Sequence, residues 1–196
     1  MGDSDGSGMM TAAVALLRAV NLGGHNRIGM EALRALHESL GLRDVQTYVQ
    51  SGNVVFTAPG RDIGPLPKRI EAAIEPAFGF RCAVILRTAA ELRDVVRRNP
   101  FAGRTDVESS RLIVVFLSRE PDSEARTKAL AIKLGPEETK IEGREVFVFY
   151  PNGVGRSKLT VAVMEKALGV VGTGRNWNTV TKLLEMVERR AGTGRE

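Results

Sequence analysis

Two turns near the start of the chain combine glycine, asparagine and arginine, residue types that bind anions through backbone amides and guanidinium groups. They lie at residues 21–29 and 50–53. The candidate ligand-binding residues here are Arg18, Asn21, Gly23, Gly24, Asn26, Arg27, Gln50, Ser51 and Asn53. Glycines allow N–H groups to converge, and a helix expected after residue 29 adds partial positive charge at its start. The turns fit a phosphate or carboxylate site and ordinary positive-φ turns equally well.

A second candidate lies in residues 150–158, which follow an expected strand and lead into an expected helix. This is the context of the phosphate-binding loop of nucleotide triphosphatases, but Tyr150 and Arg156 stand where that motif has Gly and Lys. We therefore expect no triphosphatase. A generic anion cradle would use Gly153, Gly155, Arg156, Ser157 and Lys158. A plain helix start capped by Ser157 is the favoured interpretation.

A third candidate precedes the last expected helix and consists of Arg175, Asn176 and Trp177. Asn176 or Asn178 is expected to cap that helix. Trp177 is the only tryptophan. It either packs as a hydrophobic staple or stacks on a planar ligand beside Arg175, and the staple is favoured.

Metal-binding and nucleophilic templates find little support. His25 and His37 are the only histidines and Cys82 is the only cysteine, so we predict no metal site and no cofactor. His37 falls in an expected helix and is interpreted as a surface residue. Cys82 alternates with Val84 and Leu86 in an expected strand, which indicates a core thiol. Whether the protein is an enzyme stays open.

The elements that position these turns follow from the spacing of apolar residues, which predicts an α+β fold. Strands are expected at residues 11–20, 45–49, 53–57, 81–87, 111–117, 139–142, 145–150 and 170–175. Helices are expected at residues 30–40, 66–77, 92–98, 122–132, 157–168 and 177–189. This order corresponds to two tandem βαββαβ (ferredoxin-like) subdomains with antiparallel sheets and an extra C-terminal helix.

The same pattern predicts the domain boundaries. Residues 1–10 are expected to form a disordered tail, residues 11–99 the first subdomain, and residues 100–196 the second with the terminal helix. In a βαββαβ unit the helix between the first two strands is a crossover, so those strands run parallel. The turns at 21–29 and 50–53 should therefore emerge at the same end of one sheet.

Composition limits the partners. The formal net charge of +5 permits a polyanionic partner, but the basic residues are dispersed along the chain. No apolar run is long enough to span a membrane, and the start lacks the pattern of a signal peptide. Together with the single cysteine, these features predict a cytoplasmic protein. The oligomeric state stays open, with a monomer slightly favoured.

Four segments resemble the signature segments of the bacterial domain-of-unknown-function family 1697. They are residues 15–24, 47–56, 152–158 and 175–180, and the likeness spans nearly the whole chain after residue 10. The family usually has Gly where Ala19 stands and a basic residue near His25. The resemblance implies a cytosolic α+β protein with two ferredoxin-like subdomains, and it implies no activity.

Three functions fit these observations. The first is a binding module for an anionic, phosphate-bearing ligand such as a nucleotide or a nucleic-acid backbone. The second is a phosphate-ester or acyl-phosphate hydrolase in which Arg27 holds phosphate and Asn53 orients water, by analogy with acylphosphatases on the same fold. The third is a protein–protein interaction module that uses exposed sheet edges and the last helix.

Overall fold

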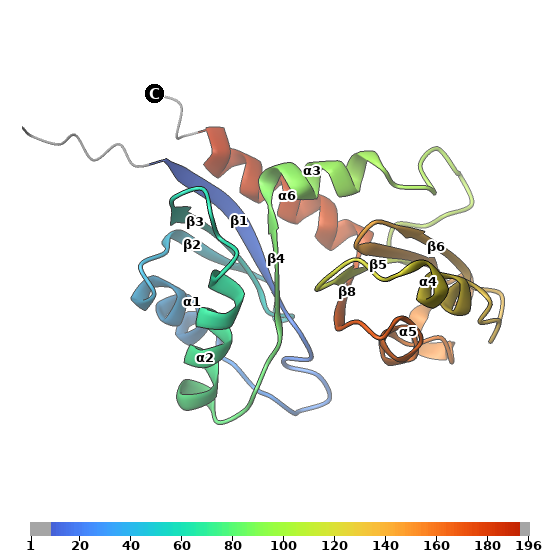
Figure 1. The fold of residues 1–196 in the computed structure, drawn as a ribbon, viewed down its shortest axis with the longest axis horizontal. Helices are drawn as coiled ribbons and strands as arrows, with labels where there is room; N and C mark the ends of the chain where they lie inside the picture. The colour runs from blue at the N-terminus through green and yellow to red at the C-terminus, as the bar shows by residue number, and fades with distance from the viewer. Residues whose placement is uncertain (1–8, 193–196) are drawn as a thin grey trace, which may run out of the picture. The chain divides into compact units, whose positions relative to one another are not determined.

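The computed structural model describes residues 9–192, which fold into an α+β protein with two four-stranded antiparallel sheets (Figure 1). The chain divides into two compact units. The first comprises the chain up to Ala89 together with the segment from Glu185 onward, and the second comprises Ala90–Leu184. The expected boundary at residues 99–100 therefore differs from this division, because helix α3 is counted with the second unit and the end of helix α6 with the first.

The first unit contains one complete βαββαβ succession. Its elements are β1 (Met10–Leu17), α1 (Met30–Ser39), β2 (Arg43–Tyr48), β3 (Asn53–Pro59), α2 (Leu66–Phe78) and β4 (Val84–Thr88). The strands lie in the order β2-β3-β1-β4 and every neighbouring pair is antiparallel. This order is compatible with the expected ferredoxin-like arrangement.

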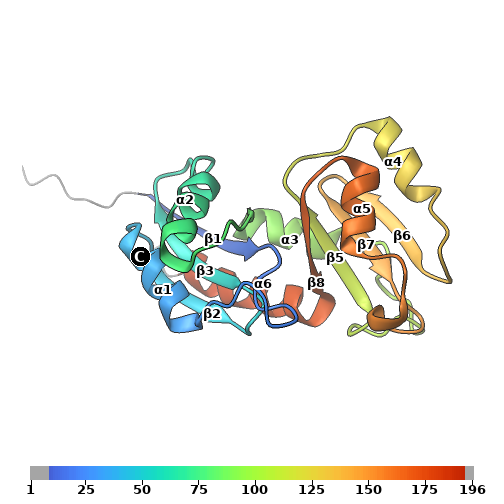
Figure 2. The ribbon, with the colours of Figure 1, turned by 90° about the horizontal axis from the view of Figure 1, so that it is seen from below.

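The core of the first unit lies between one face of its sheet and helices α1 and α2 (Figure 2). Alternate residues of β1, such as Ala13 and Leu17, face Leu33 of α1 and Ile70 of α2 in one buried cluster. Burying these side chains is the main favourable term in folding the unit. The loop and turn of the candidate site extend from the ends of β1 and β2, so this core fixes their positions.

The second unit repeats the same order. Its elements are β5 (Leu112–Leu117), α4 (Ser123–Leu130), β6 (Glu138–Glu142), β7 (Glu145–Phe149), α5 (Val161–Leu168) and β8 (Gly172–Asn176), preceded by α3 (Ala89–Arg97) and followed by α6 (Trp177–Gly192). The strand order is β6-β7-β5-β8, again antiparallel. Val115 and Leu117 pack with Ala129 of α4 and Met164 of α5 in a separate core.

Strand register shows how far the two units correspond. In β4, Arg87 lies opposite Val14 of β1, and in β8, Arg175 lies opposite Val114 of β5. Both arginines are buried. Charged side chains are seldom buried, so two at matching sheet positions extend the correspondence of the units beyond element order.

Arg190, near the end of α6, protects an edge strand of the first unit. Its guanidinium donates to the carbonyl of Asp44 at 2.8 Å and to Oε1 of Gln46 at 3.0 Å. Asp44 has a φ of +51° and lies where the register between β2 and β3 shifts. A bulge and a bound arginine both discourage another chain from pairing with this edge.

Two expectations about individual residues are wrong. Helix α5 begins at Val161 and is capped by Thr160, whose hydroxyl accepts from the amide of Val163, so Ser157 is not its cap. His37 is fully buried instead of lying on the surface. It stands one turn after Leu33, on the face of α1 that packs against the core.

Within residues 9–192, no helix combines the length and the apolar character needed to cross a membrane. In the same residues, His, Cys, Asp and Glu side chains nowhere gather in groups of three or more that could hold a metal ion.

Candidate anion-binding site

The structure brings the first loop and the second turn of the first unit together. The side-chain amide of Asn21 donates to the carbonyl of Gln50 at 2.9 Å and to the carbonyl of Ile28 at 3.1 Å. Its Oδ1 accepts from the amide of Ile28 at 2.9 Å. Asn21 therefore joins the two segments, as the parallel course of β1 and β2 requires.

The loop after β1 is held in an unusual backbone conformation. Ala19, Asn21 and Asn26 all have positive φ angles, of 54°, 54° and 50°, and Gly23 and Gly24 are also left-handed. The side-chain amide of Asn26 donates to the carbonyl of Ala19 at 3.0 Å. Both asparagines thus maintain the shape of the loop, and their amides are not directed at a ligand.

A hollow of about 450 Å³ opens where the loop, the turn and the start of α1 meet. It is lined by Asn21, Gly24, Arg27, Ile28, Gly29, Met30 and Gln50. Helix α1 has no side-chain cap, and its first backbone hydrogen bond runs from Leu33 N to Gly29 O at 3.0 Å. The amides of the first turn therefore precede the helical ladder and carry its partial positive charge.

Arg27 is the one charged side chain in the lining of this hollow. Within the described part of the chain, neither Arg27 nor the side chain of Gln50 has a hydrogen-bonding or ionic partner. Gly24 has a φ of +83°, which favours glycine, and a Cβ there would meet the Arg27 guanidinium at 3.7 Å, an ordinary van der Waals contact. Glu31 also stands in the first turn of α1, but it does not line the hollow.

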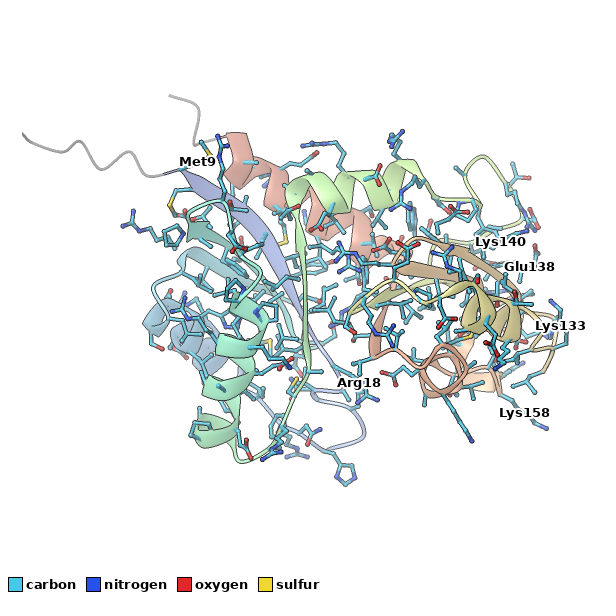
Figure 3. All side chains as sticks on the ribbon, in the orientation of Figure 1. Met9, Arg18, Lys133, Glu138, Lys140 and Lys158 are labelled. Atoms are coloured by element: carbon cyan, nitrogen blue, oxygen red, sulfur yellow. The ribbon has the colours of Figure 1, made fainter. Side chains whose placement is uncertain are left out.

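The remaining residues of the second turn stabilise the hairpin instead. Asn53 is fully buried, and its amide donates to the carbonyl of Tyr48 at 3.0 Å and to Oγ of Ser51 at 2.8 Å. Neither Asn53 nor Ser51 lines the hollow. Arg18, labelled in Figure 3, follows the last residue of β1 and also lies outside the lining.

Val49 marks strain at the edge of the site, because a β-branched residue rarely adopts its φ of +50°. Its side chain is 50% exposed, so packing does not require valine there. We expect Val49→Asn to raise the free energy of unfolding by about 1 kcal/mol, since Asn tolerates left-handed backbone. Urea denaturation would measure this. Val171→Asn, at an exposed valine without positive φ, should give no gain, and equal gains would contradict the strain argument.

The loop at residues 153–158, in the second unit, has a carboxylate beside it. The hydroxyl of Ser157 donates to Glu137 and accepts from the amide of Leu159 at 2.9 Å. Val154–Arg156 form a short 3-10 turn, and the Gly155, Arg156 and Lys158 side of the loop is exposed. The negative charge of Glu137 makes this loop less suited to an anion than the hollow of the first unit.

The phenol of Tyr150 is buried near Glu137. Burial, with a smaller contribution from the charge of Glu137, raises the pKa of Tyr150 to about 12. Its hydroxyl donates to the carbonyl of Leu159 at 2.8 Å. Tyr150 therefore stays neutral and fixes the chain just before α5.

The third candidate segment is used within the second unit. The guanidinium of Arg175 donates to Oγ1 of Thr173 and to the carbonyl of Gly174, both at 2.8 Å. Oδ1 of Asn176 accepts from the amide of Thr179 at 2.9 Å and caps α6. The ring of Trp177 lies 6.4 Å from that of Phe147, a packing contact and not an open stacking platform.

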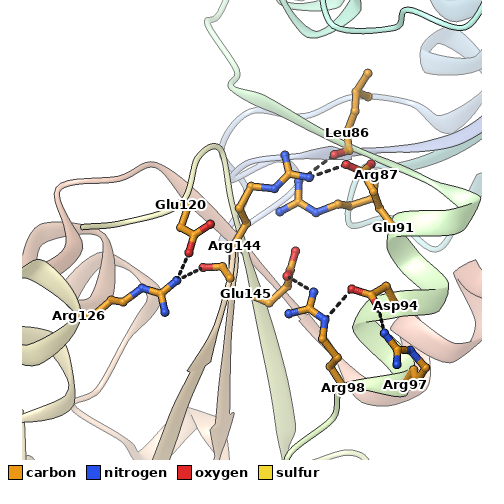
Figure 4. A network of polar contacts seen from close by, with 11 residues as sticks. Leu86, Arg87, Glu91, Asp94, Arg97, Arg98, Glu120, Arg126, Arg144 and Glu145 are labelled. Carbon is orange, nitrogen blue, oxygen red and sulfur yellow. Dashed lines mark hydrogen bonds and ion pairs between the residues drawn. The ribbon is translucent and has the colours of Figure 1, made fainter. Parts of the chain in front are cut away.

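Sequence reasoning missed a polar network that links α3 to the β6–β7 hairpin (Figure 4). Arg98 donates to Asp94 at 2.6 Å and to Glu145 at 3.3 Å, and Arg144 pairs with Glu91. Glu145 is only 2% exposed. Hydrogen bonds from Arg97 and then Arg98 hold the pKa of Asp94 below its usual range. The i,i+4 spacing of Asp94 and Arg98 in the sequence indicates an ion pair on a helix. The network is structural, because every one of its charged members is paired.

Comparison with known proteins agrees with the fold. The family model described as "Protein of unknown function (DUF1697)" matches residues 10–147. No curated protein matches the chain. A solved structure of the conserved bacterial protein SP0830 from Streptococcus pneumoniae is similar, with a TM-score of 0.74 and 22% identity, over 92% of this chain and 99% of that one. At that identity the likeness concerns the fold alone.

Proposed function

Because the chain belongs to the DUF1697 family, which is described only as of unknown function, we propose its function from its own geometry: it binds a phosphate-bearing anion in the hollow beside Arg27. We also propose that each unit is ferredoxin-like and that the protein is cytoplasmic, as the sequence predicts. The ligand proposal rests on residues of the first unit alone. The fold proposal rests on the strand order of the two sheets.

One observation carries the binding proposal. Arg27 has no acidic partner among the described residues and lines a hollow whose lining contains no carboxylate. An unpaired guanidinium offers an anion charge-assisted hydrogen bonds, and the uncapped start of α1 adds backbone donors and partial positive charge. Gly24 and Gly29 let the backbone approach a ligand closely.

The proposal stops at binding. Hydrolysis of a phosphate ester or an acyl phosphate would need a side chain that orients water at the phosphorus or the carbonyl carbon. Asn53, the residue expected in that role, donates both of its amide hydrogens within the hairpin. In the lining, the amide of Asn21 is also used, and we assign the unpartnered amide of Gln50 to the ligand.

Replacing Arg27 tests the proposal. We expect inorganic phosphate to raise the melting temperature of the unaltered protein saturably, and Arg27→Gln to weaken the affinity at least about 10-fold, because a charge-assisted bond is lost. Calorimetric titration would give both affinities. Arg43→Gln is the matched control, because Arg43 is exposed, carries the same charge and starts β2, at the opposite end from Gln50. Equal losses in the two variants would show that only net charge matters.

A further inference from the structure

We propose that the ligand of this hollow is a phosphate monoester with an uncharged, partly apolar body, of the size of a mononucleoside monophosphate. This deepens the anion-binding function proposed above and rests on it. The inference uses three properties of the lining: its charge, its volume and the side chains that face away from the phosphate position.

The charge of the lining suits one phosphoryl group. A phosphate monoester carries a charge of about −1.5 to −2 near pH 7. Arg27 supplies one positive charge, the start of α1 adds about half a charge, and the lining contains no further cation. Triphosphates and nucleic-acid strands present several anionic groups and are bound by several lysines or arginines, which this hollow lacks.

The volume leaves room for more than the phosphate. At about 450 Å³ the hollow falls within the range of sites for small organic molecules. A phosphoryl group held by Arg27 would occupy only part of this space. A bare inorganic anion would therefore leave the remainder to water, whereas a monoester would fill it with its organic body.

The rest of the lining fits such a body. Met30 is only partly buried and provides apolar surface, and its polarisable thioether packs well against aromatic rings, whereas Ile28 belongs to the core beneath. The side-chain amide of Gln50 has no partner among the described residues and carries both donors and an acceptor. Gln50 is therefore the specificity-determining residue, because it can pair with a polar edge of the body.

The experiment is a calorimetric titration of the full chain with inorganic phosphate, adenosine monophosphate, adenosine triphosphate and a single-stranded DNA oligonucleotide. We expect the monophosphate to bind about 10-fold more tightly than inorganic phosphate, with adenosine triphosphate no better. Gln50→Ala should remove most of that gain, so that the monophosphate and inorganic phosphate bind this variant with nearly equal affinities. Gln50 is exposed, so the variant should fold as the unaltered protein does, and its melting temperature checks this.

Each other outcome has a definite meaning. Equal affinities for phosphate and the monophosphate would overturn the monoester inference while leaving anion binding in place. Tighter binding of the oligonucleotide, with affinity falling steeply as salt rises, would overturn it in favour of a polyanion surface. Absence of binding by every phosphate probe would remove the proposed function and this inference together.

Discussion

The Gly52→Ala variant is expected to lose about 3–4 kcal/mol of unfolding free energy, from left-handed strain and overpacking together. Gly52 has a φ of +71°, and a Cβ there would lie 2.4 Å from Cγ2 of Val20 and 2.8 Å from Cβ of Leu17. Both neighbours are buried and cannot move aside. The carbonyl of Gly52 also accepts from the amide of Leu17 at 2.8 Å, so the clash acts directly on the end of β1.

Gly41→Ala is the control that separates strain from steric overlap. Gly41 has a similar φ of +81°, but nothing lies within 4 Å of the position of its Cβ. We expect this variant to lose only about 1 kcal/mol, the cost of left-handed backbone for a side chain. Urea denaturation of both variants would measure the difference. If the two losses were equal, the close approach of Gly52 to Val20 and Leu17 would have no energetic weight.

The second large effect is loss of stability in mild acid through His37. Burial lowers the pKa of His37 from 6.5 to about 4, against a smaller opposing effect of its hydrogen bond to Leu33 O. The folded protein binds this proton less readily than the unfolded chain. The contribution of neutral His37 to the free energy of unfolding is therefore fully present above pH 6.5. It declines as the pH falls from 6.5 to 4, by about 3 kcal/mol in all.

Chemical denaturation at several pH values between 7 and 4 would measure this loss. Carboxylates also titrate in this range, so the slope of the unfolding free energy against pH should be compared between the unaltered protein and His37→Leu. The variant should show a shallower slope, because it lacks the contribution of His37. A slope unaltered in His37→Leu would contradict the assignment. Nε2 of His37 has no hydrogen-bond partner in the described residues, so leucine removes a buried unpaired nitrogen, together with the bond of Nδ1 to Leu33 O.

Apolar periodicity was a good guide to the elements of the fold. The apolar run at residues 11–20 predicted a strand, and the residues of β1 from Ala12 to Leu17 are buried. Periodicity was a poor guide to ends and to single polar residues. Ser157 and Thr160 are both good caps by type, and only tertiary packing, with Ser157 held by Glu137, decides between them. The polar type of His37 predicts a surface residue, but its position on α1 faces the core.

Topology carried the prediction of the site further than composition did. The crossover between β1 and β2 required the two turns to be neighbours, and the hydrogen bond from Asn21 to Gln50 joins them. Residue type could not show which polar groups remain available. Asn21, Asn26 and Asn53 donate to backbone carbonyls, whereas Arg27 and the side chain of Gln50 have no partner among the described residues. Which polar groups are hydrogen-bonded depends on the folded chain and cannot be predicted from the spacing of residues.

The return of α6 to the first unit has a consequence for the order of events during translation. The segment from Glu185 onward belongs with the chain up to Ala89, so a contiguous stretch of polypeptide is interposed within the first unit. While a ribosome is still elongating that stretch, the nascent β2 lacks the guanidinium of Arg190 at Asp44. The sheet of the first unit can therefore form before the interposed unit is complete, and its β2 edge lacks this contact until α6 has emerged.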